Sequence, residues 1–185
     1  MKSPKLMMDT NSASNNQPHL ILIGFMGCGK SSVGSLLAQR LGRGFIDSDT
    51  FITDKIGLSI SEIFAQLGEA HFRKIEAESI HHFRCIKTPL VIATGGGMPA
   101  FHDISTLGEV FYLHADFDTL FERIKDSATR PLKSDYQTTH ALYLKRLESY
   151  EKQCHYKINA KNSIEKITEE ILEKILKARN LSPDT

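Results

Sequence analysis

The sequence predicts an α/β protein in which a parallel β-sheet is covered on both faces by helices. Two observations carry this prediction. Short apolar, β-branched segments alternate along the chain with longer segments whose apolar residues recur at helical spacing, and this alternation is typical of repeated βαβ units. The first apolar segment also leads through a glycine-rich turn directly into a helical segment, which is the arrangement of a phosphate-binding loop.

Short apolar runs mark the expected strands, and their continuous apolar character fits strands that are buried on both faces. In chain order the strands span residues 19–24, 44–47, 89–94, 109–114 and 156–158. Helices are expected where apolar residues recur three and four positions apart. These span residues 32–41, 116–125, 138–152 and 164–180, with Gly42 ending the first and Ser163 capping the last. Residues 48–85 are expected to be helical in pieces, with breaks at Gly57 and Gly68.

The expected organisation is a single domain over residues 19–180, because no internal repeat and no long linker divides it. Residues 1–18 are polar and contain neither an apolar run nor an arginine. They are expected to form a flexible extension and not a signal or transit peptide.

The overall charge disfavours two classes of partner. The 185 residues include 23 basic and 22 acidic side chains, for a net charge of +1, so no bulk attraction to nucleic acid or to an anionic membrane is expected. No segment reaches the roughly 18 apolar residues of a membrane span. Cys28, Cys85 and Cys154 are odd in number and form no C-x-x-C pair, which disfavours a disulfide framework or a zinc cluster and favours a cytoplasmic protein.

A phosphate-binding loop is the most specific feature of the sequence. Gly24-Phe25-Met26-Gly27-Cys28-Gly29-Lys30-Ser31 fits the pattern G-x-x-x-x-G-K-[ST]. Glycines let successive backbone N–H groups converge on phosphate oxygens, and the positive end of the following helix adds to the attraction. Lys30 supplies a charge near the β- and γ-phosphates, and the Ser31 hydroxyl is a ligand for Mg²⁺. A glycine-rich turn that binds nothing is the alternative, and the match of both pattern and context disfavours it. The expected nucleotide contacts come from Gly27, Cys28, Gly29, Lys30, Ser31 and Ser32.

Two aspartates are the best source of the acid that such loops need near the metal. The strand at 89–94 is followed by glycines, whereas the strand at 44–47 ends in Asp47 and Asp49 follows two residues later. This spacing lets one carboxylate face the metal and the other face an acceptor. The alternative is that one of them simply caps the next helix.

Three further features lie where a phosphoryl acceptor would bind. Arg73 and Glu76 share one helix face, where the alternative is a surface ion pair of about a few tenths of a kcal/mol. Gly95-Gly96-Gly97 exposes backbone at the carboxyl end of a strand, the edge at which open α/β sheets bind ligands, with a tight turn as the alternative. Arg130 lies in the polar segment 126–135 and is a candidate to stabilise transition-state charge, although a lone loop arginine is more often solvated.

Together these motifs resemble those of the shikimate kinases over about residues 19–160. The motifs are Asp47-x-Asp49, Gly68-Glu69-x-x-Phe72-Arg73-x-x-Glu76, Gly95-Gly96-Gly97, Arg130-Pro131-Leu132 and Arg146 ahead of Tyr150. The resemblance implies a three-layer P-loop NTPase fold related to the nucleoside monophosphate kinases, with strand order 2-3-1-4-5, a helical substrate-binding segment over about 48–85 and a lid over about 126–135. It also implies ATP- and Mg²⁺-dependent phosphorylation of the 3-hydroxyl of shikimate, a step of aromatic amino acid biosynthesis. The protein is expected to be a monomer.

The resemblance assigns residues to ATP and the metal. Lys30 and Ser31 serve ATP and Mg²⁺, and Asp47 helps to hold the water shell of the metal. Arg123 packs on adenine, and Arg130 contacts phosphate, so Lys30 and Arg130 count among the catalytic residues.

The resemblance also assigns the acceptor site. Asp49 binds ring hydroxyls and is the catalytic base. Arg73 and Arg146 grip the carboxylate, and Gly96, with its neighbours Gly95 and Gly97, meets the substrate through backbone atoms.

Three positions depart from the family pattern. Lys133 replaces a leucine after Arg130-Pro131-Leu132, the motif that begins at Arg146 reads R-L-E-S-Y where R-x-P-L-Y is frequent, and the nucleotide-binding turn is hard to match in residues 159–162. In the motif that begins at Arg146, Glu148 could instead pair with a neighbouring basic residue.

Two other functions stay open. One is a gluconate or nucleoside monophosphate kinase of the same fold. The other is a non-catalytic ATP sensor, against which the presence of both Asp47 and Asp49 argues.

Overall fold

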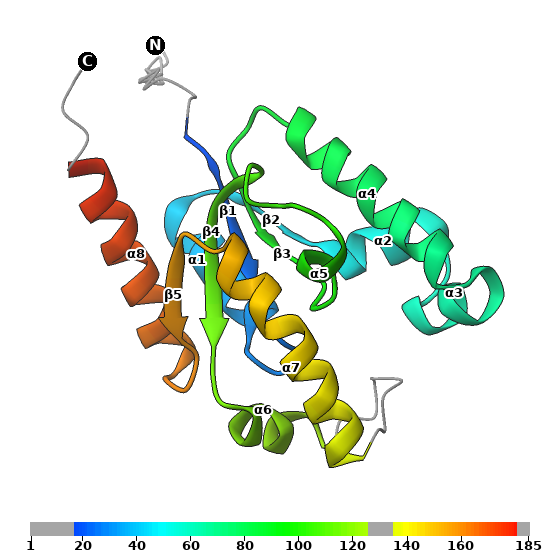
Figure 1. Cartoon of the computed structure of the whole chain (residues 1–185). Coiled ribbons are helices and arrows are strands. Elements are labelled where there is room, and N and C mark those ends of the chain that lie inside the picture. The colour runs from blue at the N-terminus through cyan, green and yellow to red at the C-terminus, as the bar shows by residue number, and fades with distance from the viewer. Residues whose placement is uncertain (1–16, 126–134, 181–185) are drawn as a thin grey trace, which may run out of the picture.

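The computed structural model describes residues 17–125 and 135–180, and a five-stranded parallel sheet forms its centre (Figure 1). The strands are β1 (His19–Ile23), β2 (Gly44–Asp47), β3 (Leu90–Ala93), β4 (Gly108–His114) and β5 (Tyr156–Asn159). Their order across the sheet is β2-β3-β1-β4-β5, and every neighbouring pair is parallel. The α/β class and the 2-3-1-4-5 strand order are therefore confirmed.

Helices lie on both faces of this sheet. They are α1 (Lys30–Leu41), α2 (Ser48–Ile56), α3 (Ile60–Leu67), α4 (Glu69–Cys85), α5 (Met98–Phe101), α6 (Phe117–Ile124), α7 (Tyr136–Gln153) and α8 (Ile164–Asn180). In Figure 1, α7 crosses in front of the sheet and α1 lies behind it, where it packs against β3 and α8. The helix α1 begins two residues before the predicted start, and the four-residue helix α5 was not predicted.

The segment between β2 and β3 folds as three helices, and the breaks predicted at Gly57 and Gly68 are confirmed. Both glycines have positive φ angles, of 76° and 79°, which side chains other than glycine rarely adopt. Ser59 begins α3 with a capping box, in which its hydroxyl and the Glu62 carboxylate satisfy each other's backbone N–H groups. A small apolar core of its own holds the three helices together, formed by Ile52, Ile63, Phe72 and Ile75.

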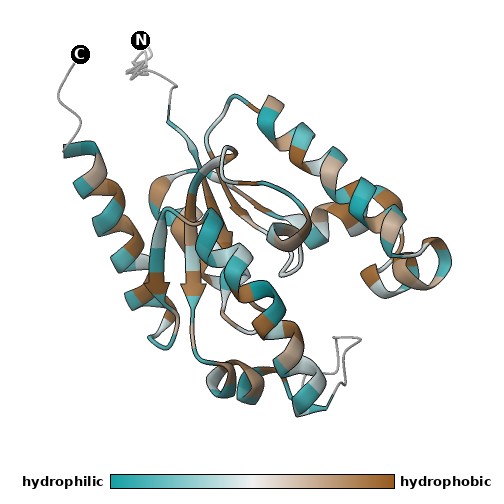
Figure 2. Cartoon of the chain, viewed as in Figure 1, coloured by the Kyte–Doolittle hydropathy of each residue, from teal (hydrophilic) through white to brown (hydrophobic). Residues whose placement is uncertain are grey.

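The main core lies between the sheet and its covering helices. All five residues of β1 are buried, as expected for the central strand of a parallel sheet. Apolar residues concentrate on the strands and on the inward faces of the helices (Figure 2). On α8 these are Ile167, Ile171 and Ile175, the stripe that the helical periodicity predicted. Within the described residues, no helix is long and apolar enough to cross a membrane.

Candidate active site

The phosphate-binding loop connects β1 to α1, and its shape depends on glycine. Gly24, Gly27 and Gly29 have φ angles of 140°, 81° and 91°. A β-carbon at Gly24 would lie 2.6 Å from the carbonyl oxygen of Leu113, and one at Gly27 would lie 2.7 Å from Ile124 Cγ2. No side chain caps the N-terminus of α1 and its first turn contains no acid, so this helix end is suited to an anion.

Lys30 folds back over the loop. Its Nζ donates hydrogen bonds to the carbonyl oxygens of Gly24 (2.8 Å) and Phe25 (3.1 Å), so its ammonium group already lies at the phosphate cradle. Lys30 Nζ also lies 3.6 Å from Cys28 Sγ. Cys28 is buried, and its N–H donates to the carbonyl oxygen of Phe25 at 3.3 Å. The thiol is therefore a packing group inside the loop, in contact with the Lys30 ammonium group.

Asp47 caps α2 and also contacts the phosphate-binding loop. Its Oδ1 accepts hydrogen bonds from the N–H groups of Asp49 (3.0 Å) and Thr50 (3.4 Å) and so caps α2. Its Oδ2 accepts a hydrogen bond from the Ser31 hydroxyl at 2.6 Å. The cap thus fixes the carboxylate with one oxygen turned toward the phosphate-binding loop.

Ser31 and Asp47 offer adjacent hard oxygen donors of the kind that Mg²⁺ prefers. The described residues contain no group of three or more His, Cys, Asp or Glu side chains placed to hold a metal. This arrangement fits Mg²⁺, which is usually held through one or two protein oxygens together with phosphates and water.

The three adjacent strands β2, β3 and β1 end at the same edge of the sheet, which brings Asp49, the glycine triplet and the phosphate-binding loop together. A β-carbon at Gly95 would collide with the Asp49 carboxylate, and one at Gly96 would lie 3.5 Å from the Gly24 carbonyl oxygen. None of the three glycines has a positive φ angle. Close approach, and not backbone conformation, is therefore what the triplet provides.

Two arginines converge on the last glycine of the triplet. A β-carbon at Gly97 would lie 3.2 Å from Arg73 Nη1 and 3.2 Å from Arg146 Nη2. Arg73 comes from α4 and Arg146 from α7. Glu148 on α7, which the sequence offered as a partner for a neighbouring basic residue, is exposed. It forms no ion pair with any residue that the structure describes.

The ion pair between Arg73 and Glu76 is largely buried, so it is not the surface ion pair that the sequence left open. Glu76 is 1% exposed and its Oε2 lies 2.8 Å from Arg73 Nη1, while the Arg73 side chain is 15% exposed. His102 Nε2 lies 3.2 Å from the same oxygen, and Glu69 binds the guanidinium group from the solvent side. His102 and Glu69 were not predicted from the sequence as site residues.

Tyr150 supports the triplet from α7. Its hydroxyl donates a short hydrogen bond of 2.5 Å to the carbonyl oxygen of Gly96. Burial raises the pKa of this phenol far above its ordinary value, with smaller opposing contributions from Arg146. Tyr150 therefore stays protonated and keeps donating.

Arg123 lies in a pocket of about 430 Å³ beside the phosphate-binding loop. Its Nη1 donates to the carbonyl oxygens of Ala160 (2.9 Å) and Gly27 (3.4 Å). Asn162 and Ser163 complete the lining on the side of α8. The polar turn that follows β5, which could not be matched from the sequence, therefore forms one wall of this pocket. Arg130 and nearly all of the predicted lid lie outside the described residues.

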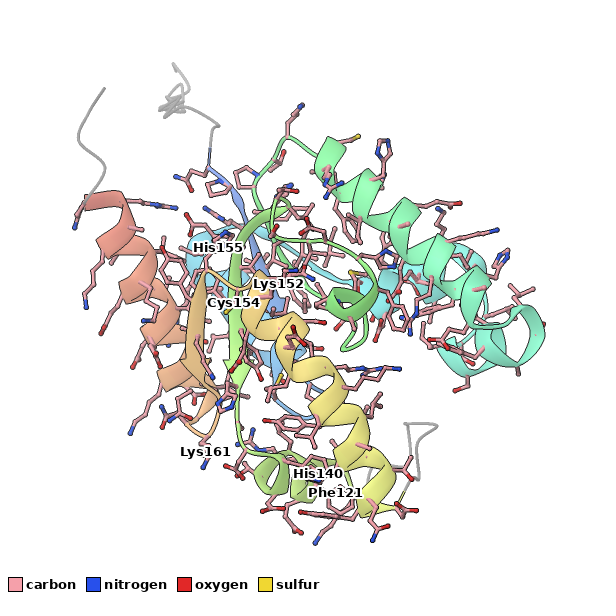
Figure 3. All side chains as sticks on the ribbon, in the orientation of Figure 1. Phe121, His140, Lys152, Cys154, His155 and Lys161 are labelled. Atoms are coloured by element: carbon pink, nitrogen blue, oxygen red, sulfur yellow. The ribbon has the colours of Figure 1, made fainter. Side chains whose placement is uncertain are left out.

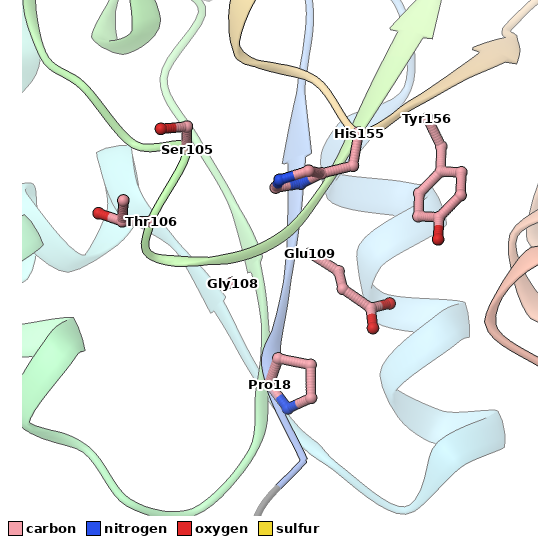
Figure 4. A pocket seen from close by; sticks show the side chains of 7 residues that line it. All are labelled: Pro18, Ser105, Thr106, Gly108, Glu109, His155 and Tyr156. Carbon is pink, nitrogen blue, oxygen red and sulfur yellow. The ribbon is translucent and has the colours of Figure 1, made fainter. Parts of the chain in front are cut away.

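A second pocket, of about 360 Å³, lies at the opposite edge of the sheet (Figure 4). Pro18, Glu109 and His155 line it near the amino ends of β1, β4 and β5. In Figure 3, His155 stands just before β5, and Lys161 lies beyond its carboxyl end. Since open parallel sheets bind ligands at the carboxyl ends of their strands, this pocket is separate from the candidate active site.

Comparison with known proteins gives a consistent result. The family model described as shikimate kinase matches residues 26–176. A shikimate kinase from Helicobacter hepaticus is 41% identical over 157 residues, which cover 84% of this chain and 94% of that protein. The structure of a shikimate kinase from Acinetobacter baumannii in complex with shikimate superposes with a TM-score of 0.81 at 32% identity, covering 91% of this chain and 97% of the other. A gluconokinase from Sinorhizobium meliloti reaches a TM-score of 0.55 at 19% identity, covering 89% and 95%, which is a likeness of fold alone.

Proposed function

The chain belongs to the shikimate kinase family, and we propose how its own residues divide the work of that activity. It is an ATP-dependent kinase that phosphorylates shikimate in the biosynthesis of aromatic amino acids. The alternatives, a gluconate or nucleoside monophosphate kinase and a non-catalytic sensor, are not favoured, because the gluconokinase shares only the fold. The observation that best supports a carboxylate-bearing acceptor is the convergence of Arg73 and Arg146 beside the phosphate-binding loop.

ATP binds with its phosphates in the loop and its base in the pocket beside Arg123. Backbone N–H groups of the loop and the positive end of α1 hold phosphate oxygens. Lys30 exchanges its two carbonyl partners for β- and γ-phosphate oxygens, a short movement because its ammonium group already lies over the loop. Arg130, outside the described residues, contacts the phosphoryl group during transfer.

The metal site consists of Ser31 and Asp47. Mg²⁺, when bound, would neutralise developing charge on the phosphate oxygens. The α2 cap holds the Asp47 carboxylate in one orientation, so that its second oxygen reaches the metal directly or through water. In this division of roles Asp49 serves the acceptor and not the metal.

Shikimate binds between the two arginines and Asp49. Arg73 and Arg146 form hydrogen bonds with its carboxylate, and the backbone of Gly96 limits the depth to which the ring enters. The Asp49 carboxylate accepts the proton of the 3-hydroxyl as the oxygen of that hydroxyl forms its bond to the γ-phosphorus. The bond from the γ-phosphorus to the β–γ bridging oxygen breaks, and ADP leaves.

Residues 19–180 act as one domain and one monomer in the cytoplasm. The three cysteines are unpaired, which supports a reducing compartment.

A coupled ADP-release assay with a panel of acceptors tests this function. Shikimate, its methyl ester, gluconate and a nucleoside monophosphate should be compared at equal concentration. Shikimate alone should support rapid turnover, and the ester, which keeps every hydroxyl and loses the charge, should be a poor substrate. Equal ATP hydrolysis with and without shikimate would contradict the activity, and equal turnover of acid and ester would contradict the carboxylate contacts.

A further inference from the structure

The guanidinium group of Arg73 has most of its hydrogen-bonding capacity committed to protein. Nε and Nη2 donate to Glu69 Oε1, at 3.3 and 2.8 Å, and Nη1 donates to Glu76 Oε2 at 2.8 Å. An arginine has five N–H donors, so one N–H remains on each terminal nitrogen. No acceptor among the described residues takes these two, and both terminal nitrogens lie within 3.4 Å of a β-carbon built at Gly97.

The plane of this guanidinium group is held by aromatic rings. Arg73 Cζ lies 3.7 Å from the ring centroid of Phe101, the separation of a face-to-face stack, and 5.2 Å from the centroid of Phe72. Phe72 belongs to the core of the helical segment, but Phe101 is 49% exposed on α5. Hydrophobic burial therefore does not account for the position of Phe101.

The helix α5 also reaches the charged partner of Arg73. His102 follows α5 directly and contacts the same Glu76 oxygen as Arg73, at 3.2 Å. Gln153 at the end of α7 fastens this segment: its amide group donates to the carbonyl oxygens of Pro99 (2.6 Å) and His102 (3.1 Å) and accepts from the N–H of Ile104 (2.8 Å). Four residues of helix are thus tied to α7, which also carries Arg146.

We propose that α5 positions the acceptor-binding arginine: Phe101 sets the plane of the Arg73 guanidinium group and His102 fixes the Glu76 carboxylate that holds its Nη1. Both are positioning residues that contact Arg73 or its partner and not shikimate. The two remaining N–H groups of Arg73 then face the acceptor as a preformed fork for a planar carboxylate. Preorganisation of this kind strengthens binding because less side-chain freedom is lost when the ligand arrives. The inference rests on the proposed role of Arg73.

Substitutions of Phe101 test the proposal by steady-state kinetics. Phe101→Ala should raise KM for shikimate by about three- to thirtyfold, the range expected for losing one cation–π stack. KM for ATP and the thermal midpoint should stay near their wild-type values, because the residue is half-exposed and remote from the nucleotide. Phe101→Tyr, which keeps the ring, should restore KM, whereas Phe101→Leu, which keeps only the apolar bulk, should not. Leu176→Ala, at an exposed apolar residue of α8, is the matched control and should change neither KM.

A second background separates positioning from direct contact. In Arg73→Ala/Glu76→Gln, which contains neither the guanidinium group nor an unpaired buried carboxylate, adding Phe101→Ala should leave kcat/KM for shikimate unchanged. A further fall there would mean that Phe101 touches shikimate itself and would overturn the positioning role. If KM for shikimate is unchanged in Phe101→Ala, or if Phe101→Leu has the wild-type KM, the inference is overturned and the proposed function still stands. A wild-type protein that does not phosphorylate shikimate overturns both the inference and the proposed function.

Discussion

Replacing Arg73 by alanine should damage stability and acceptor binding through two separable effects. The stability effect arises at Glu76, which is 1% exposed and, within residues 17–125 and 135–180, would keep His102 as its remaining ion-pair partner. Removing one member of a buried ion pair costs about 3–5 kcal/mol. Because Arg73 is 15% exposed and His102 remains, we expect a cost at or just below the lower limit of that range, about 2–3 kcal/mol. A domain of this size loses about 2–4 °C of Tm per kcal/mol, so Tm should fall by about 4–12 °C.

The binding effect arises at the fork of N–H groups that faces Gly97. Truncating one partner of a desolvated, charged hydrogen-bonded pair costs about 2–5 kcal/mol. At about 1.4 kcal/mol for each tenfold change, KM for shikimate should rise by tens- to thousands-fold. Arg73→Lys should recover part of this loss, because lysine keeps the charge and lacks the fork. KM for ATP should hardly change.

The double variant Arg73→Ala/Glu76→Gln distinguishes the two effects. An amide in place of the carboxylate removes the uncompensated buried charge, so Tm should recover most of its loss. Shikimate binding should stay weak, because the fork is still absent. Thermal unfolding followed by circular dichroism and KM values for both substrates supply the measurements. If Arg73→Ala alone has the Tm of the wild-type protein, the buried-pair argument is refuted. Recovery of KM in the double variant would show that Arg73 serves structure and not the acceptor.

Two further predictions concern the reacting groups. Lys30→Met should lower kcat by about a hundredfold or more while KM for ATP changes much less, because its charge matters most as the γ-phosphoryl group leaves; a variant with wild-type kcat would refute the assignment. Asp47→Asn should raise the Mg²⁺ concentration needed for half-maximal rate. It should leave α2 capped, since asparagine caps a helix as well as aspartate does. Asp49→Asn, in contrast, should abolish turnover and leave Mg·ATP binding intact. Identical metal titrations of the two variants would contradict that division of labour.

The strands and most helices could be predicted because their signals are local. The apolar runs gave the five strands to within about two residues at each end, and the glycines at 57 and 68 marked real helix ends. The helix α5 could not be predicted, because four residues that begin Met98-Pro99 contain no periodicity. Its conformation depends on the contacts of Gln153, which lies more than fifty positions further along the chain.

The motifs named residues that the structure brings together at the carboxyl edge of the sheet, but the sequence could not predict which of their side chains are buried or which partners they contact. Arg73 and Glu76 at a spacing of three are equally consistent with a surface pair and a buried one. The structure shows that Glu76 is 1% exposed and that His102, directly after α5, contacts its carboxylate. Likewise Cys28 is buried and its Sγ lies 3.6 Å from Lys30 Nζ, which a loop pattern alone does not indicate.

The sequence could not decide whether Asp47 caps a helix or faces the metal. The structure explains why, because one carboxylate can be placed for both. A carboxylate has two oxygens, and Asp47 uses one to cap α2 and the other to meet Ser31. A helix cap is therefore no argument against a metal ligand at this position. It supports that role, because a capping bond removes the rotational freedom that a ligand would otherwise lose on binding. The same reasoning applies to Arg73, which pairs with Glu69 and Glu76 while its two terminal nitrogens lie beside Gly97. Residues next to such dual-purpose groups, including Phe101 and His102, are where further influence on specificity should be sought.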